Sequence, residues 1–177
     1  IIFVLLVVMG WFNIYSAVYD EQKSDIFNFK RLESKQLMFV IVSIVIAFSI
    51  MVIDASFFTA TSFYIYGTIL FLNLIVAFAG EEIKGSRSWF KFAGFGFQPA
   101  EFAKFATALA LAKFLSGLNR PDIKKALGIA LAIIAIPVFI IILLQRETGV
   151  ALVFAALVLV LYREGLIAGW ILLIGLV

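Results

Sequence analysis

Long uncharged runs of apolar residues, separated by short charged segments, are the feature that most constrains this chain. A bilayer core about 30 Å thick needs roughly 20 apolar residues in a helix, so runs of this length are typical of membrane spans. Only helices and closed barrels satisfy their backbone polar groups in lipid, and continuous rather than alternating apolar residues favour helices. The uncharged runs lie at 1–19, 36–53, 55–80, 126–144, 148–162 and 165–177.

A further helix is predicted at 99–118, because Pro99 is a favourable first helical residue and most of the segment is Phe, Ala and Leu. We therefore expect an all-α, polytopic transmembrane helix bundle that forms a single membrane domain. Pro137 lies within a span and should kink it. The predicted helices, about seven in all, cover approximately 1–19, 36–53, 56–79, 99–118, 126–144, 148–162 and 165–177.

The chain starts at Ile1 and ends at Val177, in each case inside an apolar run and without an initiator methionine. We expect it to be an excerpt of a longer protein, with the first and last helices truncated.

Composition excludes several classes of protein. Hydrophobic residues make up 64% of the 177 residues and charged residues 14%, whereas soluble domains are about 45–50% apolar and about 25% charged. A soluble globule and a disordered chain are both excluded. The absence of Cys and His removes disulfides, thiolate metal sites and histidine-based catalysis from this segment. The small net charge of +3 supports no nucleic-acid role.

Charge gives an orientation. Alternating helices place the loops 20–35, 80–98 and 145–147 on one side, and these loops carry more Lys and Arg than the opposite side. The positive-inside rule would place them in the cytoplasm.

The segment 85–104, GSRSWFKFAGFGFQPAEFAK, carries the chemical signal. Glu101 and Lys104 are three residues apart and share a helix face, and ionisable groups within a membrane helix by default mark a functional site. With Arg87, Lys91 and the aromatic Trp89, they predict a basic, aromatic-edged pocket for an anionic, lipid-linked ligand. The competing interpretation is that Glu101 complements the helix N-terminus, Lys104 snorkels and Trp89 anchors at the interface.

These residues resemble the shape, elongation, division and sporulation (SEDS) family of cell-wall proteins, which includes RodA and FtsW. That family has a glycine-rich loop with an Arg/Gln–Trp element, followed by Gln-Pro-Ser-Glu and a lysine three residues later. Here the matching residues are Gly85, Arg87, Trp89, the tetrapeptide 98–101 with alanine in place of serine, and Lys104. Gln98 thereby joins the candidate site residues.

A second family element, Gln-Pro-Asp-x-Gly-Thr-Ala-Leu, has a looser counterpart at 145–152. Arg146 replaces proline, Glu147 replaces aspartate and Val150 replaces threonine. Glu147 is retained as a candidate cavity residue, and Gly149 has the simpler explanation of a helix-start turn.

The resemblance implies the first seven helices of a protein with about ten, in the bacterial cytoplasmic membrane. It implies a peptidoglycan glycosyltransferase that polymerises lipid II, most like the RodA elongation protein, with a class B penicillin-binding transpeptidase as partner. The essential aspartate of the family would lie beyond Val177, so the sequence offers no catalytic base here. The resemblance also places the loop 80–98 outside the cell, against the charge count, and we follow the resemblance.

Two other functions stay open at this point: a flippase for a lipid-linked precursor and a non-catalytic scaffold of the cell-wall machinery. A requirement for a divalent cation is also open, because no cluster in the sequence has convincing ligand spacing.

Overall fold

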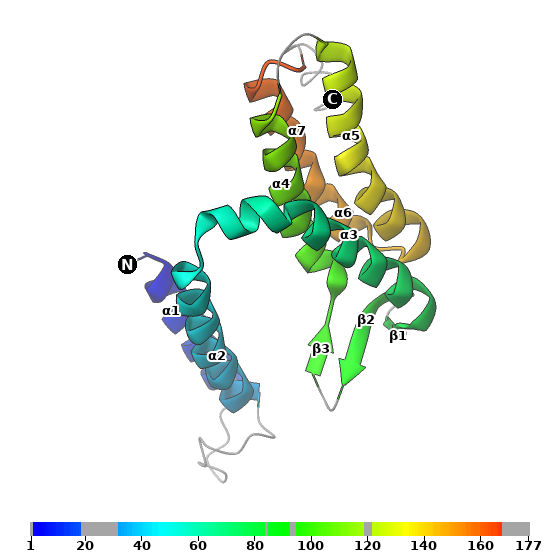
Figure 1. Ribbon diagram of the computed structural model, residues 1–177. Helices are drawn as coiled ribbons and strands as arrows, with labels where there is room; N and C mark the ends of the chain where they lie inside the picture. Colours follow the sequence, from blue (N-terminus) through cyan, green and yellow to red (C-terminus); the bar gives the residue numbers. More distant parts are fainter. Residues whose placement is uncertain (1, 19–31, 84, 93–94, 119–121, 168–177) are drawn as a thin grey trace. The chain divides into compact units, whose positions relative to one another are not determined.

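The computed structural model describes residues 2–18, 32–83, 85–92, 95–118 and 122–167. The chain forms two units, Ile1–Asp54 and Ala55–Val177. The described parts are mostly helical, which confirms the expected fold class (Figure 1). Three described helices are long and apolar enough to cross a membrane, at Ser34–Val52, Ala55–Ala79 and Ile123–Leu144.

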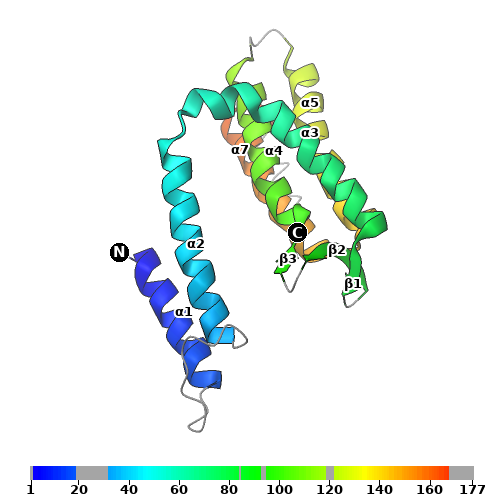
Figure 2. The same ribbon diagram turned by 60° about the horizontal axis from the view of Figure 1, so that its bottom comes forward.

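The first unit consists of helices α1 (Ile2–Val18) and α2 (Leu32–Val52), which lie side by side in both views (Figures 1 and 2). Every apolar side chain of α2 from Ile41 onward is exposed, as is expected for a surface that faces lipid rather than protein. This helix begins at Leu32, ahead of the predicted start at 36, because charged residues can extend a helix beyond the hydrocarbon.

The second unit contains the remaining helices. Helix α5 passes without a break into a π-helical turn, η1, and the short helices α6 and α7 are joined by a 3₁₀ turn, η2. The bounds are α3 (Ala55–Ala79), α4 (Pro99–Ser116), α5 (Ile123–Phe139), η1 (Ile140–Leu144), α6 (Thr148–Leu152), η2 (Val153–Ala155) and α7 (Ala156–Arg163).

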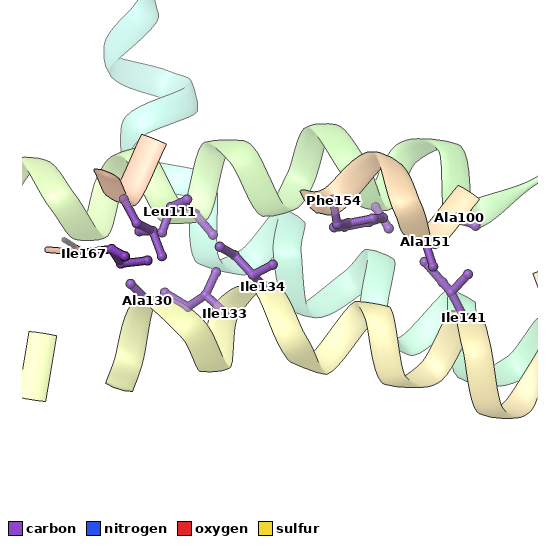
Figure 3. Packing of buried hydrophobic residues seen from close by; sticks show 12 residues of the cluster. Ala100, Leu111, Ala130, Ile133, Ile134, Ile141, Ala151, Phe154 and Ile167 are labelled. Carbon is purple, nitrogen blue, oxygen red and sulfur yellow. The ribbon is translucent and has the colours of Figure 1, made fainter. Parts of the chain in front are cut away.

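Helix α4 packs along α3 and α5 through small side chains. Ala103, Ala106 and Ala110 are almost fully buried, together with Thr107 and Leu111. Small residues let helix backbones approach closely, which is the main source of packing energy between helices in lipid. The wider core is apolar and is shown in Figure 3: Ile133, Ile134 and Ile141 from α5 and η1 lie opposite Leu111, Ala151 and Phe154.

A hydrogen bond between α3 and α5 compensates for Pro137. Proline has no N–H, so the carbonyl four residues earlier, that of Ile133, loses its helical donor. The Tyr66 hydroxyl donates to this carbonyl at 2.8 Å. The proline therefore creates an acceptor that joins two helices.

Residues 80–98, expected to be a loop, contain a three-stranded antiparallel sheet in the order β1–β2–β3. The strands are β1 (Glu81–Ile83), β2 (Ser86–Phe92) and β3 (Phe95–Phe97). Gly85 has φ +85° in the turn between β1 and β2, a conformation that L side chains rarely adopt. Glycines and charges in this segment resemble loop signals. In the structure Ser86 and Ser88 are buried while Arg87 and Lys91 are exposed, so side chains of β2 alternate between two faces as in any strand.

The predicted final helix at 165–177 lies largely outside the described residues. The described chain ends after α7 in a turn at Gly165, where φ is +73°.

Tyr66→Phe should lower the free energy of unfolding by about 1 kcal/mol, because it leaves the Ile133 carbonyl without a donor in an apolar region. The measurement is unfolding of the intact protein in detergent micelles. Tyr64→Phe is the matched control, since Tyr64 lies on the same helix and is 79% exposed.

In a Pro137→Ala background, the backbone N–H restored at position 137 can donate to the same carbonyl. Tyr66→Phe should then cost less. An equal cost in both backgrounds would contradict the proposed pairing of Tyr66 with the proline.

Candidate functional site

The three-stranded sheet forms one end of the second unit, between the end of α3 and the start of α4 (Figures 1 and 2). Strand β2 pairs with both neighbours, placing Trp89 opposite Glu81 and Lys91 opposite Gly96. Phe97 of β3 contacts Phe102 of α4, with ring centroids 4.9 Å apart. The sheet is thus fixed to the helices that it connects.

Two ion pairs join β1 to β2. The Arg87 guanidinium lies 3.2 Å from Glu82 Oε2, and the Lys91 ammonium pairs with the Glu81 carboxylate. All four side chains are about half exposed, so each pair contributes at most about 1 kcal/mol to stability. Their larger effect is to neutralise both cations locally.

The indole of Trp89 lies against the backbone of β3. A Cβ placed on Gly96 would stand 3.0 and 3.1 Å from two atoms of the Trp89 ring. Glycine at 96 therefore allows the ring to lie across the strand, where it forms one wall of a cavity.

A chain of hydroxyl and amide contacts links the sheet to the start of α6. The buried Ser88 hydroxyl donates to Glu147 Oε1 at 2.9 Å and accepts from Gln98 Nε2 at 3.4 Å. Ser86 donates to the Gln145 carbonyl at 2.9 Å, and its hydroxyl also lies 3.1 Å from that of Ser88. Gln98 and Glu147, both predicted from sequence as site residues, are thus linked through Ser88, which the sequence analysis did not name.

Gln145 connects the sheet to α3. Its fully buried side chain donates from Nε2 to the backbone carbonyl and to Oδ1 of Asn73, at 3.0 and 2.9 Å. Its backbone carbonyl accepts from the Arg87 N–H at 3.2 Å. Asn73 is fully buried as well and donates to the Ile69 carbonyl at 2.8 Å. Gln145, at the break between η1 and α6, is therefore hydrogen-bonded to both helix α3 and strand β2.

Arg146 follows in a left-handed conformation, with φ 59°. For a residue with a side chain this costs roughly 1–2 kcal/mol. A proline ring, which fixes φ near −65°, is incompatible with this conformation. The next residue, Glu147, donates its N–H to the Ile141 carbonyl at 3.1 Å.

Two cavities lie at this end of the unit. The first, of about 580 Å³, is lined by Ile83, Ser86, Trp89, Lys91, Gly96, Arg146 and Glu147. The second, of about 400 Å³, is lined by Ala77, Phe78, Glu82, Gly85, Arg87, Leu144, Gln145 and Arg146.

Some of the site residues predicted from sequence line these two cavities, and others do not. Trp89, Lys91 and Glu147 line the first cavity, and Arg87 lines the second. Glu101 and Lys104 pair with each other at 2.7 Å on α4 and line neither of these two cavities. Within the described residues, no group of three carboxylate, histidine or cysteine ligands gathers to hold a metal ion.

Sequence reasoning missed four residues that build the site: Asn73, Ser88, Gln145 and Arg146. Asn73 did carry a signal, since an amide in a membrane span must find a partner. The role of Ser88 depends on strand register, which the loop interpretation could not supply. Gln145 and Arg146 were noticed only as parts of a motif.

A sequence profile of the cell cycle protein family of FtsW, RodA and SpoVE matches residues 1–177. The chain is 32% identical over 181 residues to stage V sporulation protein E of Bacillus subtilis (strain 168), covering 98% of this chain and 49% of that protein. It is 28% identical over 127 residues to peptidoglycan glycosyltransferase RodA of Treponema pallidum (strain Nichols), covering 72% and 29%. The chain thus spans about half the length of the first relative and less of the second.

Solved structures of related proteins match this chain as well. The crystal structure of the Thermus thermophilus rod shape determining protein RodA matches with a TM-score of 0.78 at 28% identity, over 96% of this chain and 54% of that one. A chain from a structure described as a peptidoglycan synthase complex that coordinates polymerization and crosslinking matches with a TM-score of 0.76 at 28% identity, over 98% and 48%.

Gln145→Leu should lower the free energy of unfolding by about 1–3 kcal/mol, since it keeps the side-chain volume but removes the donor to two buried oxygens of Asn73. Unfolding of the intact protein in detergent measures this loss. Gln98→Leu, which removes only a 3.4 Å contact from a half-buried side chain, is the control and should cost less. Equal losses of unfolding free energy in the two variants would show that the hydrogen bonds to Asn73 stabilise the protein no more than the Gln98 contact does.

Proposed function

The chain belongs to the FtsW, RodA and SpoVE family of cell cycle proteins, and we propose from this premise that the intact protein is a peptidoglycan glycosyltransferase. It would polymerise lipid II into glycan strands at the outer face of the bacterial cytoplasmic membrane. The relative from Treponema pallidum carries the name of this activity, and three described helices of this chain are long and apolar enough to cross a membrane.

The observation that supports this proposal best is the cavity of about 580 Å³ beside the sheet. It combines the aromatic wall of Trp89, the cations Lys91 and Arg146, and the carboxylate Glu147. A lipid-linked sugar diphosphate needs such a combination: an aromatic surface for a sugar or lipid, and cations for the diphosphate.

In the proposed reaction, a hydroxyl of the acceptor sugar attacks the anomeric carbon of the donor and gives its proton to a base, while the bond from that carbon to the lipid diphosphate breaks and the diphosphate leaves. Positive charge near the diphosphate stabilises the leaving group as its negative charge develops. Lys91 and Arg87 would supply part of this charge where the diphosphate displaces Glu81 and Glu82 from them. Lys104, held by Glu101 on α4, would contribute if substrate extends toward that helix. We assign no catalytic base to the described residues.

We propose cell elongation and shape maintenance as the cellular role, supported by the match to Thermus RodA along 96% of the chain. The sporulation protein of Bacillus subtilis shows higher identity than the Treponema RodA, so identity does not separate the two roles. A class B penicillin-binding transpeptidase is the proposed partner, supported by the match to a chain of a peptidoglycan synthase complex.

The purified intact protein, given lipid II in liposomes, should produce glycan strands that gel electrophoresis resolves. Trp89→Ala should reduce their formation at least about tenfold, because it removes the aromatic wall of the cavity. Trp11→Ala, on α1 in the other unit, is the matched control and should retain activity. Translocation of lipid II without chain growth would instead favour a flippase. The absence of both chain growth and translocation would favour a scaffold.

We also propose that the sheet faces the cell exterior. These 177 residues contain no cysteine, so labelling beyond that of the parent protein reports the side of the membrane on which a single introduced thiol lies. Glu82→Cys on β1 should react with a membrane-impermeant maleimide in intact cells. Ser116→Cys, at the other end of α4, should react only after permeabilisation. The reverse pattern would overturn the orientation.

A further inference from the structure

The charges around the two cavities are not equivalent. Arg87 and Lys91 are each paired with a glutamate of the neighbouring strand β1. Lys104 is paired with Glu101 on its own helix. A ligand anion approaching any of these three cations must compete with a carboxylate that is already in contact.

Arg146 differs from all three. Its side chain is exposed, and no carboxylate of the described residues lies within ion-pair distance of its guanidinium. It lines both the 580 Å³ and the 400 Å³ cavity. Its charge is therefore available to a ligand in either hollow.

The position of Arg146 is fixed from both sides. Gln145 before it is fully buried and bonded to Asn73, Ser86 and the Arg87 N–H. Glu147 after it accepts from Ser88 and donates its N–H to Ile141. These contacts hold the intervening residue at φ 59°. Strained residues held by their surroundings are concentrated at functional sites.

We propose that Arg146 is the residue that binds the phosphate group of an anionic lipid in the cavity beside Trp89. Guanidinium is suited to this because its planar donors match phosphate oxygens in a bidentate contact. Lys91 supports the binding from the same cavity, and Glu147 opposes it, with one carboxylate oxygen engaged by Ser88. The proposal deepens the proposed function and rests on it for the identity of the lipid.

The same phosphate chemistry has two sources in a membrane: the diphosphate of a polyprenyl carrier and the headgroup of an anionic phospholipid. Farnesyl diphosphate is a soluble probe for the first, with uncharged farnesol as its control. Binding to the intact protein is measured in phosphatidylcholine nanodiscs and again in nanodiscs containing phosphatidylglycerol.

Arg146→Ala should weaken binding of farnesyl diphosphate about tenfold or more, the usual effect of removing a hydrogen-bonded charge partner. Arg146→Lys should recover part of this loss. Arg163→Ala, an exposed basic residue at the end of α7 that lines neither cavity, is the matched control and should bind like the parent. Displacement of the probe by phosphatidylglycerol would identify the headgroup as the natural occupant of the same phosphate site.

Arg146→Gly separates binding from folding. Glycine adopts a positive φ without strain, so this variant should unfold at no lower temperature than the parent while losing the probe. Unchanged probe binding in both Arg146→Ala and Arg146→Gly, or no binding by the parent, overturns the proposal. Because binding is measured without turnover, a parent that binds the probe but makes no glycan would refute the proposed function alone.

Discussion

The buried amide of Gln145 is the contact on which the arrangement of the site depends. It lies at the break between a π-helical turn and α6, and its Nε2 donates two hydrogen bonds to Asn73 of α3. The backbone carbonyl of the same residue accepts from the Arg87 N–H and the Ser86 hydroxyl. In an apolar environment an unpaired polar group is costly, so these partners cannot separate cheaply. Segments distant in the sequence are consequently held in one position at the edge of the bundle.

Electrostatics at this edge follow from that position. The antiparallel pairing of β1 with β2 sets Glu81 and Glu82 against Lys91 and Arg87, which neutralises both strands locally. The same fixed backbone leaves Arg146 beside both cavities without a described carboxylate partner. Within the bundle, a buried acceptor is likewise paired by a distant side chain. Pro137 removes the helical donor of the Ile133 carbonyl, and the Tyr66 hydroxyl donates to that carbonyl instead.

The helical content was predictable from sequence, because apolar runs are local patterns. The structure places the candidate residues Trp89, Lys91 and Glu147 around one cavity, and their roles stay predictions. Glu101 and Lys104, grouped with Arg87 in one predicted pocket, pair with each other on α4 and line neither of the two cavities beside the sheet. Ser88 and Asn73 were missed because their importance comes from partners far along the chain.

By itself, the sequence determined a membrane protein of apolar helices with a polar, aromatic segment between two of them, since burial in lipid requires a composition that can be read residue by residue. Tertiary structure alone decided which cations are neutralised and which face a cavity. The ion pairs between β1 and β2 depend on strand register. The hydrogen bonds that fix the cavity wall join residues about 60 or 70 positions apart, as in Ser88 with Glu147 and Gln145 with Asn73. No local pattern encodes those distances, because they arise only when the helices pack.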